Sequence, residues 1–170
     1  MPMSTENLNN QEAINKIQEI IDKTDIGMMC TFGEGKDYPH VVPMSRQEID
    51  EAGNIWFLFS SESETHQNLQ QNDKISLLYA HVGDYAFLSM NGNAVISRDQ
   101  ARIDKYWNKM MESWFEKGKE DPRIRVLQVI PAEAHYWDTQ SNKLVTIFKM
   151  AASAISGKPM DIGREGALNL

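Results

Sequence analysis

The sequence predicts a mainly β protein with helices, of the α+β class, whose strands form a small antiparallel barrel. Short apolar runs of strand length alternate with turn residues along most of the chain. The long run over 85–96 carries Asn91-Gly92-Asn93 at its middle, and a glycine there typically marks a bulge or a sharp bend of a barrel strand. Apolar residues at helical spacing occur in three further places.

Each element has its own signal. Strands are expected over 26–32, 40–45, 55–59, 75–82, 85–96, 124–130 and 132–137, the last two separated by Pro131. Helices are expected over 14–21 and 144–155, and a middle helix is expected with Asp99 near its start and Gly118 after its end. Pro43 lacks a ladder donor, so its strand should lie at a sheet edge or carry a bulge. The apolar stripe of the middle helix would contain Ile103, Trp107, Met110, Met111 and Trp114.

Length and composition indicate one globular domain. The chain has 170 residues, of which 41% are hydrophobic and 24% charged. We expect a frayed N-terminus over 1–10, the domain over 11–156, and an irregular tail over 157–170 that packs on the barrel or on a partner subunit. The apolar runs are far shorter than the roughly 20 residues of a membrane span, so no membrane partner is expected.

Charge and cysteine usage limit the partners and the compartment. The net charge is −7 and the basic residues are scattered, which argues against nucleic acid as a partner. The single cysteine, Cys30, cannot form an internal disulfide, and the N-terminus does not resemble a secretory signal. We therefore expect a cytoplasmic protein.

A strand followed by hydroxyl residues and a helix start is typical of an anion site. Here the strand over 55–59 is followed by Ser60, Ser61 and Ser63, and serine is a favourable N-cap. The first N–H groups of a helix lack intrahelical partners and attract phosphate. Thr65 can add a hydroxyl donor and His66 a charged one when protonated. An ordinary capped helix with a solvated turn fits the same residues.

Motifs for other chemistry are missing from the sequence. The four histidines are dispersed and no Cys-x-x-Cys occurs, so no metal site is predicted. Dinucleotide, phosphate-loop and hydrolase-elbow motifs do not occur either. Cys30 within MMCTF is predicted to be a buried small hydrophobe rather than a nucleophile. No catalytic side chain is assigned, and redox chemistry would require a bound cofactor.

Several segments together resemble a known family. They are PMS over 43–45, GNIWFLFSSESETHQNL, SMNGNAVISRDQARIDKYWNKMMESWFEKGKEDPR, AHYWD over 134–138 and the final GKPMDIGREGALNL. From about Gln11 to the end, the chain resembles the general stress protein 26 group of the pyridoxamine 5′-phosphate oxidase-like, FMN-binding split barrels. The resemblance implies a six-stranded split barrel that forms a homodimer, with FMN in two clefts at the subunit interface.

The resemblance also implies the residues that bind the flavin. The phosphate would lie on the strand-to-helix segment, the ring along the strand over 43–45, and aromatic side chains of the partner subunit over the ring. Trp107, Trp114 and Trp137 are the candidates for that cover. The cofactor-binding residues would be Pro43, Met44, Ser45, Phe59, Ser60, Ser63, Thr65 and His66, with Trp107 and Trp137.

Two positions depart from the family pattern. Val42 stands where the family usually has arginine, and His66 where it usually has lysine. Arg46 would face the same side of its strand as Val42 and could replace the arginine. Since the unperturbed pKa of histidine is near 6.5, we expect weaker FMN binding that strengthens at mildly acid pH.

Three functions are consistent with these observations. The first is a flavin-dependent oxidoreductase with an unidentified small-molecule substrate or nicotinamide donor. The second is a flavin carrier, sensor or stress-response protein without turnover. The third is a dimeric barrel that has lost FMN or holds another ligand, such as FAD or haem.

Overall fold

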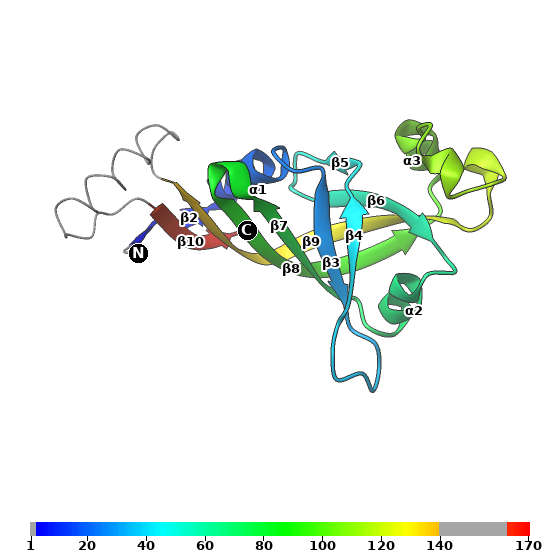
Figure 1. Ribbon diagram of the computed structural model, residues 1–170, viewed down its shortest axis with the longest axis horizontal. Helices are drawn as coiled ribbons and strands as arrows, with labels where there is room; N and C mark the ends of the chain where they lie inside the picture. Colours follow the sequence, from blue (N-terminus) through cyan, green and yellow to red (C-terminus); the bar gives the residue numbers. More distant parts are fainter. Residues whose placement is uncertain (1–2, 140–162) are drawn as a thin grey trace. The chain divides into compact units, whose positions relative to one another are not determined.

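The computed structural model describes residues 3–139 and 163–170 (Figure 1). Within these residues the helices are α1 (Asn10–Ile21), α2 (Glu64–Gln71) and α3 (Gln100–Tyr106), with 3-10 turns over Val82–Asp84, Met111–Ser113 and Gly118–Glu120. The strands are β1 (Met3–Thr5), β2 (Leu8–Asn9), β3 (Ile26–Thr31), β4 (His40–Ser45), β5 (Glu48–Ile49), β6 (Ile55–Ser60), β7 (Lys74–His81), β8 (Ala86–Ser97), β9 (Ile124–Thr139) and β10 (Gly163–Asn169).

The chain forms two compact units. The central unit comprises Ile26–Leu77 and Asn91–Ala132, and the terminal unit Met1–Asp25, Leu78–Met90 and Glu133–Leu170. The strand order is β1-β10-β9-β8-β7-β3-β4, with β6 attached to β9 and β5 to β6. The mainly β fold is confirmed. The sheet is mixed, because β1 and β2 run parallel to β10, and its described strands do not close into a ring.

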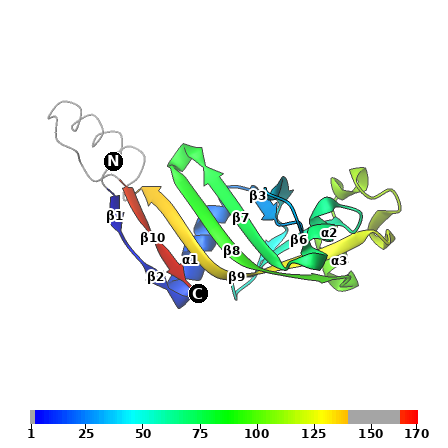
Figure 2. The same ribbon diagram turned by 90° about the horizontal axis from the view of Figure 1, so that it is seen from below.

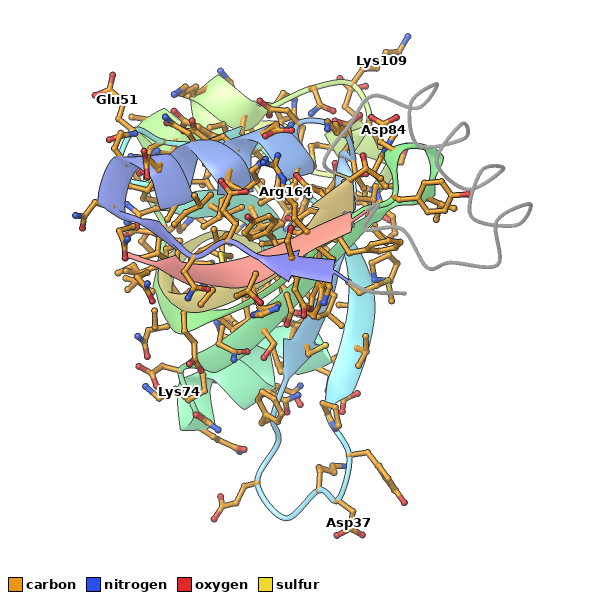
Figure 3. The ribbon with its side chains drawn as sticks, turned by 90° about the vertical axis from the view of Figure 1, so that its left-hand side faces the viewer. Asp37, Glu51, Lys74, Asp84, Lys109 and Arg164 are labelled. Atoms are coloured by element: carbon orange, nitrogen blue, oxygen red, sulfur yellow. The ribbon has the colours of Figure 1, made fainter. Side chains whose placement is uncertain are left out.

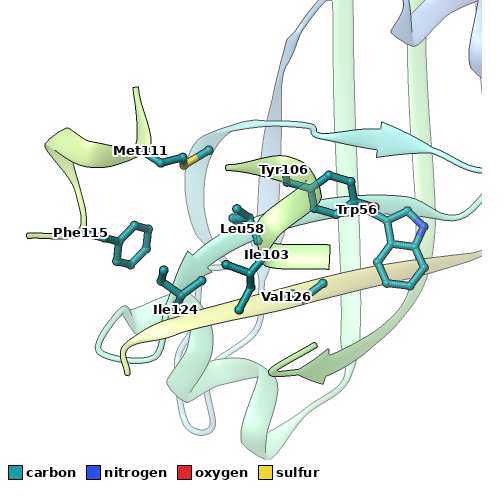
Figure 4. Packing of buried hydrophobic residues seen from close by; sticks show 8 residues of the cluster. All are labelled: Trp56, Leu58, Ile103, Tyr106, Met111, Phe115, Ile124 and Val126. Atoms are coloured by element: carbon teal, nitrogen blue, oxygen red, sulfur yellow. The ribbon is translucent and has the colours of Figure 1, made fainter. Parts of the chain in front are cut away.

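The core of the central unit is built on β6. All of Ile55–Phe59 is buried, as expected for a strand covered on both faces. Its antiparallel partner β9 runs beside it, pairing Ile55 with Val129 and Ser60 with Ile124. α3 and the following turns pack on these two strands (Figure 4). The buried cluster consists of Trp56, Leu58, Ile103, Tyr106, Met111, Phe115, Ile124 and Val126.

The predicted middle helix is wrong in length. It starts at its Asp99 cap as expected but ends at Tyr106. The Asn108 side chain donates to the Tyr106 carbonyl and accepts from the Met110 N–H, and such local bonds compete with helix continuation. Trp114 is consequently 72% exposed instead of sharing the buried stripe.

The terminal unit contains strands where irregular chain was expected. The last residues form β10, which pairs antiparallel with β9, and β1 and β2 lie along β10 (Figure 2). Helix α1, which corresponds to the helix expected over 14–21, belongs to the same unit. Its Lys16 Nζ lies 3.0 Å from Asp138 Oδ2 of β9. Arg164, labelled in Figure 3, donates from Nε to Asp138 Oδ1 at 2.6 Å. Glu6 pairs with the same arginine.

Other expectations concern edges, prolines and membranes. β4, which carries Pro43, is the last strand of the order, so its edge position is confirmed. Pro131 does not divide the strand, because β9 continues through it. None of the described helices is long and apolar enough to cross a membrane. The helix expected over 144–155 lies outside the described residues.

Gly92 allows β8 and β9 to approach closely. A Cβ at this position would lie 2.4 Å from the Ile130 carbonyl oxygen, which is backbone and cannot rotate away. The glycine expected to mark a bend therefore has a steric role in the central unit.

We predict that Gly92→Ala lowers the free energy of unfolding by about 1–3 kcal/mol, because the new methyl group overlaps the β9 backbone. Urea denaturation measures the change. Gly83→Ala is the matched control, since its Cβ would meet only the edge of the His81 ring at 3.2 Å. Equal stability of the two variants would contradict the prediction.

Candidate functional site

The predicted anion site lies where β6 ends and α2 begins. Ser63 is the N-cap of α2: its hydroxyl accepts from the His66 N–H at 3.1 Å and donates to the Ser60 carbonyl at 2.7 Å. The Ser60 hydroxyl accepts from the Glu62 N–H. Ser63 therefore shapes the turn, and its hydroxyl hydrogen is already used within the protein.

The turn is fixed to the start of β9. The Ser61 N–H donates to the Arg123 carbonyl at 2.8 Å. Arg123 forms a two-point ion pair with Asp121, which is buried, and its Nη1 lies 3.7 Å from Glu62 Oε2. The hydrogen bonds from Arg123 hold the pKa of the Asp121 carboxyl well below its usual range. The site therefore rests on a rigid support.

Several donors of the first turn of α2 have no partner within the described residues. They are the backbone N–H groups of Glu64 and Thr65, the Thr65 hydroxyl and the single N–H of the neutral His66 ring. Thr65 is 4% exposed and His66 8% exposed. Side chains in a helix lean toward its N-terminus, so the Thr65 and His66 side chains belong to the same end of α2 as the free N–H groups.

His66 is a neutral donor rather than a cation. Burial first, and then the positive charge of Arg125, lower the pKa of His66 below its ordinary value. Its ring packs on Phe59 with centroids 5.8 Å apart. Without ligand, the His66 imidazole is therefore mostly neutral at pH 7. The expected strengthening of FMN binding at mildly acid pH stays a prediction.

Arg125 is a basic residue near the predicted anion site that the sequence analysis did not single out. It lies on β9 directly opposite Phe59 of β6. Its Nη1 donates to the carbonyls of Pro122 and Ile124, each at 2.8 Å. The sequence shows a charged residue within the apolar run over 124–130. It does not show the strand register that places this residue opposite Phe59.

The predicted ring-binding residues lie on β4. Pro43, Met44 and Ser45 pair with Met28, Gly27 and Ile26 of β3. The beginning of β4 is tied to the first turn of α2, because His40 Nδ1 lies 3.4 Å from Glu64 Oε2. The β4 residues and the strand-to-helix segment thus belong to the same central unit.

The two tryptophans of the predicted cofactor set belong to different units. Trp107 follows α3 and packs on Phe115, with ring centroids 6.4 Å apart. Trp137 belongs to the terminal unit, on β9, where its ring lies 4.5 Å from that of His135. Their assignment to a flavin cover stays a prediction.

Other candidate chemistry is weak. Burial raises the pKa of the Cys30 thiol, which fits a structural cysteine on β3. No metal-binding group of histidine, cysteine and carboxylate side chains occurs in the described ranges. A pocket of about 400 Å³ lies near the opposite end of α2 and has no basic lining residue; it is lined by Phe32, Gly33, Glu34, Gln71 and Asn72.

Comparison with known proteins supports this architecture. The chain is 26% identical to protein bli-3 of Neurospora crassa over 164 residues, 90% of this chain and 78% of that protein. A structure from Jannaschia sp. CCS1 named for general stress protein 26 superimposes with a TM-score of 0.73 at 19% identity, covering 94% of this chain and 96% of that one. The general stress FMN/FAD binding protein of Xanthomonas citri superimposes with a TM-score of 0.64 at 27% identity, covering 78% and 93%.

These similarities confirm the fold, a split-barrel arrangement of mainly β structure. The family profile described as pyridoxamine 5′-phosphate oxidase like matches residues 12–161. The chain therefore belongs to the pyridoxamine 5′-phosphate oxidase-like family.

Proposed function

We propose that this protein binds FMN, with the flavin phosphate at the first turn of α2. The observation that carries the proposal is a set of donors at this turn that have no partner in the part of the chain that the structure describes. They are the side chains of the two buried residues Thr65 and His66 and two backbone N–H groups. A phosphate group offers acceptors to all of them. The FMN/FAD-binding relative from Xanthomonas citri gives independent support.

The rest of the flavin would extend from α2 toward β4. Pro43 lacks an N–H, and its strand lies at the sheet edge, so neighbouring backbone groups are available to the ring. The Phe59 ring packs against the His66 ring and so helps to hold His66 in place. When bound, the flavin would supply electron or hydride transfer, and the protein would orient it and exclude water. We infer an oxidoreductase-type role in the cytoplasm, with a substrate still to be identified.

We further propose that two copies associate through the outer face of β3 and β4. Ile26, Met28 and Val41 are 56%, 41% and 43% exposed on these strands. Their register places Met28 opposite Pro43 and Ile26 opposite Ser45, so the apolar face is continuous with the proposed ring site. A second copy would cover this face and complete the flavin cleft.

The visible absorbance spectrum tests FMN binding. We expect the purified protein, mixed with FMN and desalted, to retain a flavin spectrum in near-stoichiometric amount. Thr65→Val should weaken retention by roughly tenfold, because it removes a hydroxyl donor but keeps the shape of the side chain. A wild-type protein that releases all added FMN would contradict the proposal and favour a barrel without flavin.

Sedimentation velocity tests the association. We expect a species of about twice the 19.4 kDa chain mass, and Met28→Glu should convert it to a monomer by placing a charge in the apolar face. Val95→Glu is the matched control, since Val95 is also exposed, at 45%, but lies on β8. A monomeric wild-type protein, or a dimer unaffected by Met28→Glu, would contradict the assignment.

The protonation state of His66 can be measured by NMR. We expect its titration midpoint below 6.5, because burial and the nearby Arg125 charge disfavour the imidazolium. Since the folded-state pKa is depressed, this group opposes folding as the pH falls through and below 6.5, and is silent above it. The signal is assigned by its loss in His66→Gln, and a midpoint at or above 6.5 would disprove the neutral state.

A further inference from the structure

The charge balance around the first turn of α2 is unfavourable for a phosphate dianion unless a cation is present. Glu62 lies in the turn and Glu64 at the first helical position, and both are acidic. His66 is unprotonated at neutral pH, as argued above. α2 has no basic residue in its last turn either. The first turn of α2 therefore offers donors without a permanent positive charge.

Two arginines at the start of β9 lie near this turn, but their charges are used differently. Arg123 is neutralised by Asp121, with bonds of 3.0 Å and 2.8 Å, and also lies near Glu62. Arg125 donates only from Nη1, and its acceptors are the carbonyls of Pro122 and Ile124. No carboxylate pairs with Arg125 among the residues the structure describes, so its full charge and its Nε and Nη2 donors are available.

The register directs Arg125 to the phosphate site. It lies opposite Phe59, and Phe59 contacts the His66 ring. The next pair along the same ladder is Ser60 with Ile124, at the point where β6 turns toward α2. The lowering of the His66 pKa by the positive charge of Arg125 agrees with this placement.

We propose that Arg125 is the cation that holds the flavin phosphate, while His66 and Thr65 serve as neutral donors beside it. The inference rests on the proposed FMN function and adds the residue that confers the preference for a phosphorylated flavin. Two free guanidinium donors allow a bidentate contact with phosphate oxygens. The two bonds from Nη1 hold the side chain in place before the ligand binds, which reduces the entropy cost of binding.

The test compares FMN with riboflavin, which has the same ring but no phosphate. We expect Arg125→Gln to weaken FMN binding about 10- to 100-fold, the range for a lost charge-assisted contact, and to leave riboflavin affinity within roughly twofold. Arg125→Lys should recover part of the FMN affinity because it restores the charge. Flavin fluorescence quenching gives the dissociation constants. Unchanged riboflavin binding also shows that the variant is folded.

Arg98→Gln is the matched control. It removes the same charge from the central unit, but within the described residues the Arg98 guanidinium donates to the Glu120 carbonyl, at 3.4 Å, and not to the turn before α2. A second readout needs no flavin: Arg125→Gln should raise the NMR titration midpoint of His66, whereas Arg98→Gln should not.

The possible outcomes separate the two claims. If the wild-type protein binds neither flavin, the proposed function itself fails, and this inference fails with it. If the wild-type protein prefers FMN but Arg125→Gln binds it as well as Arg98→Gln does, only the role of Arg125 is overturned. Equal loss of FMN and riboflavin affinity in Arg125→Gln would likewise overturn it, because it would indicate a structural role.

Discussion

The pairing of β6 with β9 is the constraint on which the candidate site depends. Six successive residue pairs, from Ile55 with Val129 to Ser60 with Ile124, fix the register of two buried strands. A shift by one residue would turn every side chain of β6 to the opposite face and place Arg125 away from α2. The ladder also positions the Ser60 turn against Arg123. The same β6–β9 pairing therefore determines both the packing of the core and the position of the residues proposed to bind the phosphate.

The proposed phosphate site would let an acidic protein attract an anion. The chain carries a net charge of −7, so its overall field does not favour phosphate. What matters is local: a helix start with donors that have no partner among the described residues, and Arg125, which forms no ion pair with a described carboxylate. Arg123, two residues away, has the same side chain but is committed to Asp121 and to the shape of the turn. The two arginines thus have separate roles: Arg123 is structural, and Arg125 is proposed to bind the ligand.

Sequence patterns predicted much of the fold but only part of the site. Apolar runs located β3, β4, β6, β7 and β8 well, because burial imposes their composition. The middle helix was overextended, since the side-chain bonds of Asn108 that end the regular structure leave no trace in hydrophobic spacing. β10 was missed because its polar sequence is stabilised by pairing with β9. The serine run located the start of α2 at its Ser63 cap, whereas the position of Arg125 opposite Phe59 depended on strand register.

A crystal structure of the protein with FMN would test the account most directly. The account predicts the phosphate within hydrogen-bond distance of the Thr65 N–H and of the Arg125 guanidinium, with the ring extending toward Pro43. A flavin bound elsewhere, such as in the pocket lined by Phe32 and Asn72, or a phosphate held without Arg125, would contradict it.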